Sequence, residues 1–464
     1  MFSYIINIKM SSASVIQRSA DSSAFVSSIK SRGSSTNPNS IPVLYKSEVN
    51  TALCCKSKVV ASPNTSVGYD RLVQIELQNY DHLQKLFLKT TFSAGDFSTN
   101  VSSTTNAIAL KDWIGAFVGR EFRIVYNGTI LAKLTPAYIV ARLMKEAGTG
   151  ERVGLCNMLG GWDTSTSGSY VVADGTTIDS QKAEGRTASP QEFYCPLPFW
   201  FSEKSALALD CGILHGRLTL EIDVDTKSNC HSITGSGGEA CELTNMEAVQ
   251  YSCSLHPRQE EEHRALSYSP KQPLTQIGYD ITEFSEMNLE NDKKHAIKLN
   301  SITGYVQRLW IIMRSESDTA NFKNYAIKSA TLKAMGSEIY KCEDLSKAEG
   351  RLEDYVNGNF HTKLNTNNTI TENTNVDNNS IFCMDFKDVN GSKLRSACNG
   401  GISFAGLSVP TLEVQGCAQD GSMNGQELAG TDAKLKFTII AESYNMVVYS
   451  TNESGATSLK TLRQ

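Results

Sequence analysis

Short runs of alternating apolar and polar residues recur along this chain, and they limit the folds that it can adopt. Every second residue of Val73–Gln78 is apolar, and the same pattern returns in Arg217–Val224 and Lys434–Ile440. A period of two places successive side chains on opposite faces of a strand, so each run predicts a half-buried β-strand. Further strand-like runs are Leu86–Leu88, Leu274–Ile281, His295–Ile302, Tyr305–Met313, Ala326–Ala334, Ile381–Phe386 and Ile402–Leu407.

The clearest turn signal is the pair Asn127-Gly128, which divides the β-rich stretch Phe122–Leu134. Two-residue hairpin turns need positive φ at both central residues, and Asn-Gly suits that need. Thr135 and Pro136 then favour the start of a helix over 137–147, with Thr135 as its N-cap. Few other segments predict a helix, so the chain reads as a β-sandwich or β-barrel protein.

The length of 464 residues allows two such halves of about 200 residues each. The charged segment Arg258–Arg264 separates two sets of predicted strands, and 148–190 and 361–380 read as long polar loops. The Ser- and Asn-rich beginning reads as a mobile arm or an extended strap, or equally as a tail without a role, and Met10 could be the true initiator. We predict an N-terminal arm over 1–66, a first domain over 67–257, a linker over 258–270 and a second domain over 271–464.

The charge balance argues against a protein that coats nucleic acid. The chain carries 44 basic and 49 acidic residues, a net charge of −5. Proteins that neutralise phosphates usually have a strong basic excess. We therefore expect no direct nucleic-acid binding. No segment reaches the roughly 20 apolar residues of a membrane-spanning helix.

The 12 cysteines are scattered, and none forms a C-x-x-C pair. Many lie in apolar runs, where free cysteine behaves as a small hydrophobic residue, so we interpret most as reduced core residues. The vicinal pair Cys54-Cys55 is the exception, because it lies in a polar stretch. Cys230-His231 with Cys241 lacks a fourth ligand and is a weak candidate for a metal site.

The sequence lacks the common motifs of catalysis. The sequence contains no phosphate-binding loop of the G-x-x-x-x-G-K type, no H-E-x-x-H and no G-x-S-x-G. The glycines of Gly148–Gly154 have the wrong spacing for a dinucleotide loop. His215 is better explained as a packed structural residue than as a ligand, and Glu260–Glu262 as a solvated turn. We predict no catalytic, cofactor-binding or metal-binding residues, and no enzyme.

Four segments, in this order, resemble the double jelly-roll major capsid proteins of nucleocytoplasmic large DNA viruses, virophages and Polinton-like viruses. The first, Cys195–Ile222, has prolines, an aromatic cluster, Leu-Ala-Leu, a histidine and an alternating strand. The second, Tyr251–Asp280, has a tyrosine-containing strand, a charged segment and a new strand. The third, Lys298–Met313, contains Val306-Gln-Arg-Leu-Trp, and the fourth, Ala441–Tyr449, resembles the closing strand of that family.

The resemblance implies an all-β fold of two consecutive eight-stranded jelly-roll sandwiches with short helices in loops. It implies a major capsid protein that forms homotrimeric, pseudo-hexagonal capsomers, which tile an icosahedral shell. The implied partners are the chain itself, minor capsid or cement proteins, penton proteins and an internal membrane reached by the arm. The implied location is the virion, after assembly in the host cytoplasm or a viral factory. The alternative is a minor capsid, penton, receptor-binding or carbohydrate-binding jelly-roll protein, because jelly rolls host both roles.

Overall fold

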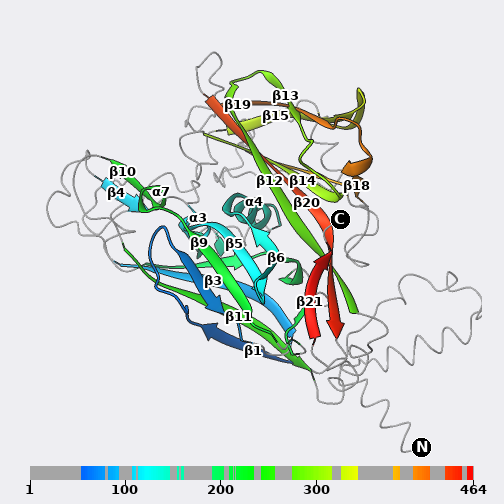
Figure 1. Cartoon of the computed structure of the whole chain (residues 1–464). Coiled ribbons are helices and arrows are strands. Elements are labelled where there is room, and N and C mark those ends of the chain that lie inside the picture. The colour runs from blue at the N-terminus through cyan, green and yellow to red at the C-terminus, as the bar shows by residue number, and fades with distance from the viewer. Residues whose placement is uncertain are drawn as a thin grey trace, which may run out of the picture. The chain divides into compact units, whose positions relative to one another are not determined.

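A computed structural model describes residues 54–146, 154–160, 191–255, 274–315, 325–342, 380–386, 401–418, 434–451 and 457–462, with gaps inside the first three ranges, the longest at 94–106. These residues form antiparallel β-sheets with a few short helices (Figure 1). Within the described residues, strands of the first half pair only with one another, and so do strands of the second half. The predicted linker 258–270 and most of the predicted loops 148–190 and 361–380 lie outside the described residues.

The first half contains two main sheets, in the strand orders β1-β11-β3-β7 and β2-β9-β5-β6. If these eight strands are numbered along the chain, the orders are first, eighth, third, sixth and second, seventh, fourth, fifth. That order is the one of a jelly roll, a sandwich built from two Greek keys. Its strands are β1 (Cys54–Ala61), β2 (Leu72–Glu76), β3 (His82–Phe92), β5 (Gly119–Tyr126), β6 (Thr129–Leu134), β7 (Gln191–Leu197), β9 (Leu218–Val224) and β11 (Leu243–Leu255).

The second half repeats this order strand for strand, in the sheets β12-β20-β14-β17 and β13-β19-β15-β16. The predicted double jelly roll is thereby confirmed. The eight strands are β12 (Leu274–Glu290), β13 (Lys294–Lys298), β14 (Tyr305–Ser315), β15 (Tyr325–Ala334), β16 (Ser337–Cys342), β17 (Ile381–Asp385), β19 (Thr411–Ala418) and β20 (Lys434–Thr451).

Smaller elements complete both rolls. The short strands β4 (Ala107–Leu110), β8 (Leu209–Asp210), β10 (His231–Thr234), β18 (Ile402–Ser403) and β21 (Thr457–Leu462) extend the sheets or pair with each other. The helices are α3 (Ile114–Phe117), α4 (Pro136–Glu146) and α7 (Lys227–Cys230), with 3-10 turns η4 (Trp200–Ser202) and η6 (Phe404–Gly406). None of the helices described is long and apolar enough to cross a membrane.

Two predictions that depend only on residues close together in the sequence, a turn and a helix start, are confirmed. Asn127 and Gly128 have φ values of 45° and 81° and form the turn between β5 and β6. The helix α4 begins at Pro136, as predicted. The predicted N-cap bond is wrong, because the buried Thr135 hydroxyl has no hydrogen-bond partner. The backbone carbonyl of Thr135 instead accepts the N–H of Ile139 at 3.0 Å.

Two other expectations need correction. The first jelly roll begins before the predicted boundary at residue 67, because β1 lies inside the stretch assigned to the arm and pairs with β11. Its sequence does not alternate, and its partner lies far along the chain, so no local pattern marks it. The predicted strand Ile402–Leu407 is a two-residue strand followed by the 3-10 turn η6.

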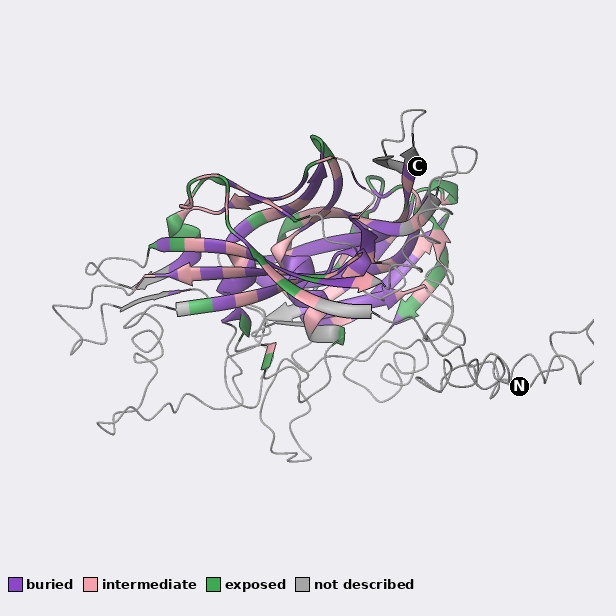
Figure 2. Ribbon diagram, turned by 90° about the horizontal axis from the view of Figure 1, so that it is seen from below, coloured by how far each residue is buried: buried purple, intermediate pink, exposed green. Residues whose placement is uncertain are grey.

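Both sandwiches have apolar interiors. Figure 2 shows buried residues running along the strands, with exposed residues mainly at turns and strand ends. In the second roll, one cluster joins residues from both sheets, and Leu309, Leu412 and Phe437 are completely buried in it. The strand alternation that predicted β20 therefore places Phe437 in the core, as a period of two requires.

The strand order also divides each roll into two ends. Successive strands of the eight run in opposite directions, so their connections alternate between the ends. The last residues of the first, third, fifth and seventh strands lie at one end, among them Leu134 of β6 and Cys342 of β16. The turns Asn127-Gly128 and Met335-Gly336, and the last residues of β7 and β17, lie at the opposite end, here called the turn end.

Candidate functional site

The most elaborate group of polar side chains lies where the first roll meets the second. Both sandwiches belong to one compact unit, Ser57–Ser252 with Ser269–Gln464. The centre of this junction is α4, which contacts α3 and β5 of the first roll and β14 of the second. Tyr138, Ile139, Val140 and Ala141 on α4 are completely buried. A helix that is buried on every side needs neighbours on every side, and here two domains supply them.

Arg142 is the main cation of the junction and is only 2% exposed. Its Nη1 donates to the Tyr138 hydroxyl at 2.8 Å, to the carbonyl of Pro198 at 3.3 Å and to the Tyr279 hydroxyl. Its Nε donates to Glu146 at 3.1 Å, and its guanidinium carbon lies 5.0 Å from the centre of the Tyr279 ring. One side chain of the first roll thus binds a strand of the second roll through both charge and hydrogen bonds.

Glu442 on β20 is the matching buried carboxylate, with no exposed surface. Its Oε2 accepts the Tyr138 hydroxyl at 3.1 Å and the Trp310 indole N–H at 3.3 Å. Its Oε1 accepts the side-chain amide of Gln307. A buried charge is strongly destabilising unless it is paired and hydrogen-bonded, and these three donors meet that need.

Arg308 on β14 links this carboxylate to two others. Its Nε lies 3.2 Å from Asp385, and its Nη1 lies 3.2 Å from Glu146 and 3.9 Å from Glu442. Burial opposes the charge of Arg308, but Glu442 and Asp385 outweigh burial and hold its pKa well above the ordinary value. Burial also raises the pKa of Tyr138 well above its usual range, so that this residue remains a hydroxyl donor.

A second set of contacts joins the connection 198–217 of the first roll to the strands of the second. The Tyr279 hydroxyl donates to the Pro198 carbonyl at 2.6 Å, and the Gln276 side chain donates to the Ala208 carbonyl at 3.2 Å. The Asp210 N–H donates to the Tyr449 hydroxyl at 3.4 Å. These contacts lie at the turn end of the first roll and at the start of β12, so the turn ends of both rolls lie on the same side.

Gly278 on β12 allows the connection 198–217 of the first roll to pack closely against the second roll. A Cβ at Gly278 would lie 3.3 Å from the indole ring of Trp200, which is itself 1% exposed. Contacts of that length are tighter than almost all that real Cβ atoms make. The absence of a side chain at this position therefore lets the β12 backbone lie directly on the indole ring.

The four segments that carry the family resemblance all contribute to this junction. Each segment supplies residues that contact the other roll directly, or residues that hold such a contacting residue in place. They are Pro198, Trp200 and Asp210 from the first segment, Gln276, Gly278 and Tyr279 from the second, Gln307, Arg308 and Trp310 from the third, and Glu442 and Tyr449 from the fourth.

Sequence reasoning missed the contribution of α4. The prediction placed a helix here but gave no role to its polar residues. Tyr138, Arg142 and Glu146 follow one another at intervals of four and so share one face of the helix. A stripe of polar residues on an otherwise apolar helix was the available signal for a buried network.

The weak ligand candidates are not brought together in the described residues. Cys230 is buried, and His231 is 2% exposed, with its Nδ1 2.9 Å from the Lys227 carbonyl and its ring against Tyr69. Within the described ranges, no three side chains of metal-binding type converge. Cys241, His215 and Glu260–Glu262 lie outside the described residues.

The geometry of the junction is suited to fixing two domains in place. A buried network leaves its partners unpaired when one member is removed, which typically destabilises a protein by about 3–5 kcal/mol. Such networks favour one arrangement of the domains over others, because each donor and acceptor is satisfied only there. The arrangement therefore joins two jelly rolls into one rigid building block.

Comparisons with known proteins agree with this fold. No protein-family model matches the chain, and no curated protein matches it significantly. Among solved structures, VP54 of PBCV-1, fitted into a reconstruction of the Sputnik virophage, has a TM-score of 0.61 at 13% identity, over 90% of this chain and 99% of that chain. The Faustovirus major capsid protein has a TM-score of 0.59 at 11% identity, over 92% and 97%. A chain of the Sputnik virophage has a TM-score of 0.54 at 11% identity, over 93% and 92%.

These likenesses extend over nearly the full length of both partners, so they include both rolls and their order. At identities this low, they establish the fold and not the activity. The chain has the double jelly-roll fold of viral capsid proteins.

Proposed function

We propose that this chain is a major capsid protein, a structural protein that works by self-assembly. Three copies would form a capsomer in which six jelly rolls surround a three-fold axis, and these capsomers would tile the flat faces of an icosahedral virion shell. The observation that carries the proposal is the junction centred on Arg142 and Glu442, which joins two rolls of identical strand order into one block.

The physical argument is one of symmetry. A block with two equivalent rolls gives six similar lobes when three copies surround an axis, so a trimer can occupy a hexagonal lattice position. The rolls must keep a fixed relative orientation for that lattice to close. The buried contacts of Tyr138 and Tyr279 with the opposite roll supply this rigidity.

The turn end gives the proposed capsomer a direction. β1 starts at the turn end of the first roll. We assign this side to the inside of the shell, where the arm would meet minor capsid proteins or an internal membrane. The long connections at the opposite end, 148–190 and 361–380, would then face outward. Assembly would take place in the host cytoplasm or a viral factory.

The second candidate is a minor capsid, penton or receptor-binding protein with the same fold. The large fraction of each capsid chain covered by the structural likeness favours the major capsid protein, since both rolls are present at full length. A receptor-binding protein would need no lattice and would not form hexagonal trimers.

Light scattering of the purified chain after size-exclusion chromatography tests the proposal. We expect a particle of three times the 50.7 kDa chain mass, with a hexagonal outline in negative stain. A monomer at every accessible concentration would contradict the major capsid function and favour the second candidate.

A further inference from the structure

The third strands of the two rolls, β3 and β14, match residue by residue. Each contains 11 residues, and each pairs through its first two residues with a two-residue strand, β8 or β18. Aligned from their first residues, the strands bring the sequence Gln-Lys-Leu-Phe onto Gln-Arg-Leu-Trp. Lys85 therefore occupies the position of Arg308, and Phe87 occupies the position of Trp310.

In the second roll, the first roll covers these positions. Leu309 belongs to the core, so its neighbours Arg308 and Trp310 point to the opposite face of the sheet. Trp310 has no exposed surface there, and its ring lies 6.0 Å from the Tyr138 ring of α4, edge to face. Arg308 lies 3.2 Å from Glu146, which is also on α4. A cation and an aromatic ring of the second roll are thus contact points for the first roll.

In the first roll, the matching face is exposed. Leu86 lies in the core, so Lys85 and Phe87 point outward as their counterparts do. The Phe87 ring is partly exposed and lies 5.5 Å from the Tyr251 ring of β11, which is 37% exposed. Lys85 is exposed and forms no ion pair with the described residues. Lys85, Phe87 and Tyr251 are here called the aromatic face. Aromatic residues beside a cation are enriched where proteins contact each other.

We infer that the second roll of a neighbouring copy covers the aromatic face, as the first roll covers Arg308 and Trp310 within one chain. This inference rests on the proposed function, because it assigns residues to the contact between copies in a capsomer. In a ring of three copies the two kinds of roll alternate, so each first roll follows the second roll of another copy. Repeating the contact found inside the chain then closes the ring through the aromatic face.

The charges of the aromatic face indicate what the neighbour presents. Arg308 binds a carboxylate of α4, so Lys85 would receive a carboxylate of the neighbouring copy. Lys89, on the same face of β3, already lies 3.0 Å from Glu192 and 3.6 Å from Glu247. Nucleic acids and acidic lipids select a basic excess, which this balanced face lacks. A protein surface with an apolar area and an acidic group suits it better.

Photo-cross-linking of the purified oligomer tests the inference. Tyr251 is replaced by the photoreactive amino acid benzoylphenylalanine, and oligomers are assembled from a mixture of unlabelled and heavy-isotope-labelled copies. The mass of a cross-linked peptide then shows whether it joins two copies. We expect the cross-linked peptide to belong to the second roll, 271–464, of another copy.

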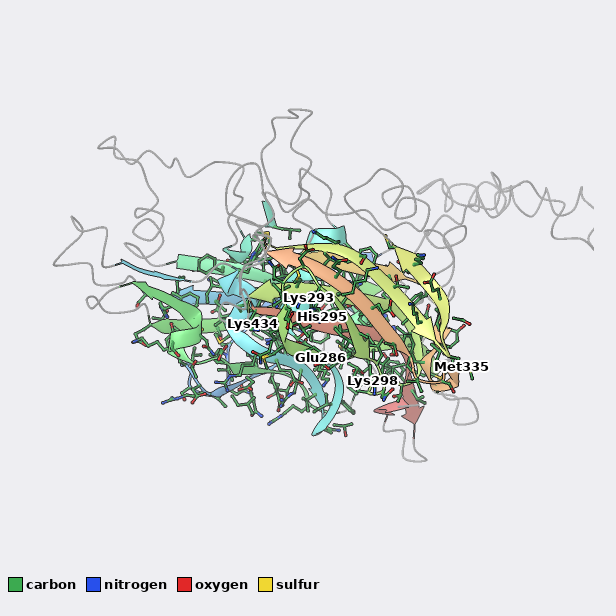
Figure 3. All side chains as sticks on the ribbon, turned by 90° about the horizontal axis from the view of Figure 1, so that it is seen from above. Glu286, Lys293, His295, Lys298, Met335 and Lys434 are labelled. Atoms are coloured by element: carbon green, nitrogen blue, oxygen red, sulfur yellow. The ribbon has the colours of Figure 1, made fainter. Side chains whose placement is uncertain are left out.

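The same replacement at Met335 is the control. Met335 is 81% exposed, and Figure 3 shows it at the margin of the ribbon, farther out than Lys298. Its counterpart in the first roll, Asn127, forms hydrogen bonds with Arg217 of its own roll. Cross-links between copies should be at least about tenfold fewer from position 335, because only docked residues react at a high effective concentration.

Charge reversal at Lys85 supplies a second readout. Lys85→Glu should raise the protein concentration at which the oligomer is half dissociated by about tenfold, because it opposes the expected carboxylate of the neighbour. Lys85→Arg keeps the charge and should leave this concentration unchanged, as should Met335→Glu. Light scattering over a dilution series measures the effect, and an unchanged melting temperature shows that the variants fold. Equal dissociation of Lys85→Glu and the wild type would overturn the inference.

The results separate this inference from the proposed function. Trimers whose cross-links from position 251 reach only the first roll of another copy, or no other copy, would overturn the contact and leave the capsid function intact. Cross-links to the second roll in open chains of copies, without trimers, would support the contact and contradict the capsomer. Monomers without cross-links would overturn both.

Discussion

The two jelly rolls follow the same path and repeat the same backbone devices, although their sequences show no obvious repeat. Asp70 and Asp292 stand two residues before the second strand of their rolls, with φ values of 54° and 57°. Their N–H groups donate to the carbonyls of Asp225 and Gly416, at 3.1 and 2.9 Å. Both carboxylates lie 2.8 Å from a cation on the fourth strand of the same roll. The two rolls thus share the backbone conformation of their turns more closely than they share amino-acid sequence.

The difference between the rolls lies in what each contributes to the junction. The first roll inserts α4 after its fifth strand, and α4 brings Tyr138 and Arg142 to the contact. The second roll has first and last strands of 17 and 18 residues, against 8 and 13 in the first roll. The longer strands carry Tyr279 and Glu442 to α4. At the junction, the first roll therefore contributes an inserted helix, and the second roll contributes a sheet with two long strands.

The largest expected effect comes from removing the buried carboxylate of the second roll. Glu442→Leu should lower the free energy of unfolding by about 3–5 kcal/mol, because it leaves the Gln307, Tyr138 and Trp310 donors without their acceptor and removes one of the three carboxylates around Arg308. Urea unfolding followed by fluorescence measures the loss. Glu286→Leu, at an exposed position on β12, is the control and should change stability by less than about 0.5 kcal/mol. Equal losses in the two variants would show that the junction contributes no special stability.

Next in size is the close approach of the two rolls at Gly278. Gly278→Ala should cost about 1–2 kcal/mol, because the new Cβ must displace the Trp200 indole from a packed site. Gly406→Ala in the second roll is the matched control, since a Cβ there meets nothing closer than 3.9 Å. That variant should be neutral or slightly stabilising. A stabilised Gly278→Ala protein would mean that β12 and Trp200 are not in close contact.

Exchanging Asn127 and Met335 tests whether the two turns are structurally equivalent. Asn127→Met should destabilise the first roll by about 1 kcal/mol, since it loses the side-chain bond to the Arg217 N–H and the residue best suited to positive φ. Met335→Asn should stabilise the second roll by about 0.5 kcal/mol for the opposite reason. Thermal unfolding of both variants measures the pair of shifts. Shifts of the same sign would contradict the equivalence of the two turns.

The smallest expected effect depends on pH. A hydrogen bond from Lys328 is the main cause that lowers the pKa of Asp292, with a further bond from Gln415 against the opposing effect of burial. A carboxylate with a lowered pKa stabilises the fold above its unfolded pKa of about 4 and loses that contribution as the pH falls through the lowered value.

Asp292→Asn should therefore cost under about 1 kcal/mol at pH 7, since the side chain is 36% exposed and screened by solvent. The difference from the wild type should shrink below about pH 4. Urea unfolding at several pH values measures it, with Asp70→Asn as the control in the more exposed counterpart at 67%. A difference that grows as the pH falls would have the wrong sign.

Features set by neighbouring residues could be read from the sequence. The turn at Asn127-Gly128, the start of α4 at Pro136 and the alternating strand at Lys434 depend only on residues close in the chain. The order of the two rolls followed from the family resemblance of four segments and not from periodicity. The resemblance identified the segments that form the junction without saying what they contact.

The remaining features depend on residues far apart in the chain. β1 could not be predicted because its partner, β11, lies beyond the first roll's other strands and its own residues do not alternate. The bond between Tyr138 and Glu442 joins positions 304 residues apart. No sequence pattern in α4 or β20 predicts this hydrogen bond, because the bond is strong only when both side chains are buried, and they are buried only in the folded chain.

The central claim is that two unlike versions of one roll form a rigid block that assembles as a trimer. A cryo-electron microscopy reconstruction of the purified oligomer tests it most directly. We predict six jelly rolls around a three-fold axis, with first and second rolls alternating and the contacts of Arg142 and Glu442 intact within each copy. A monomer, a two-fold dimer, or rolls whose relative orientation varies from particle to particle would contradict the claim.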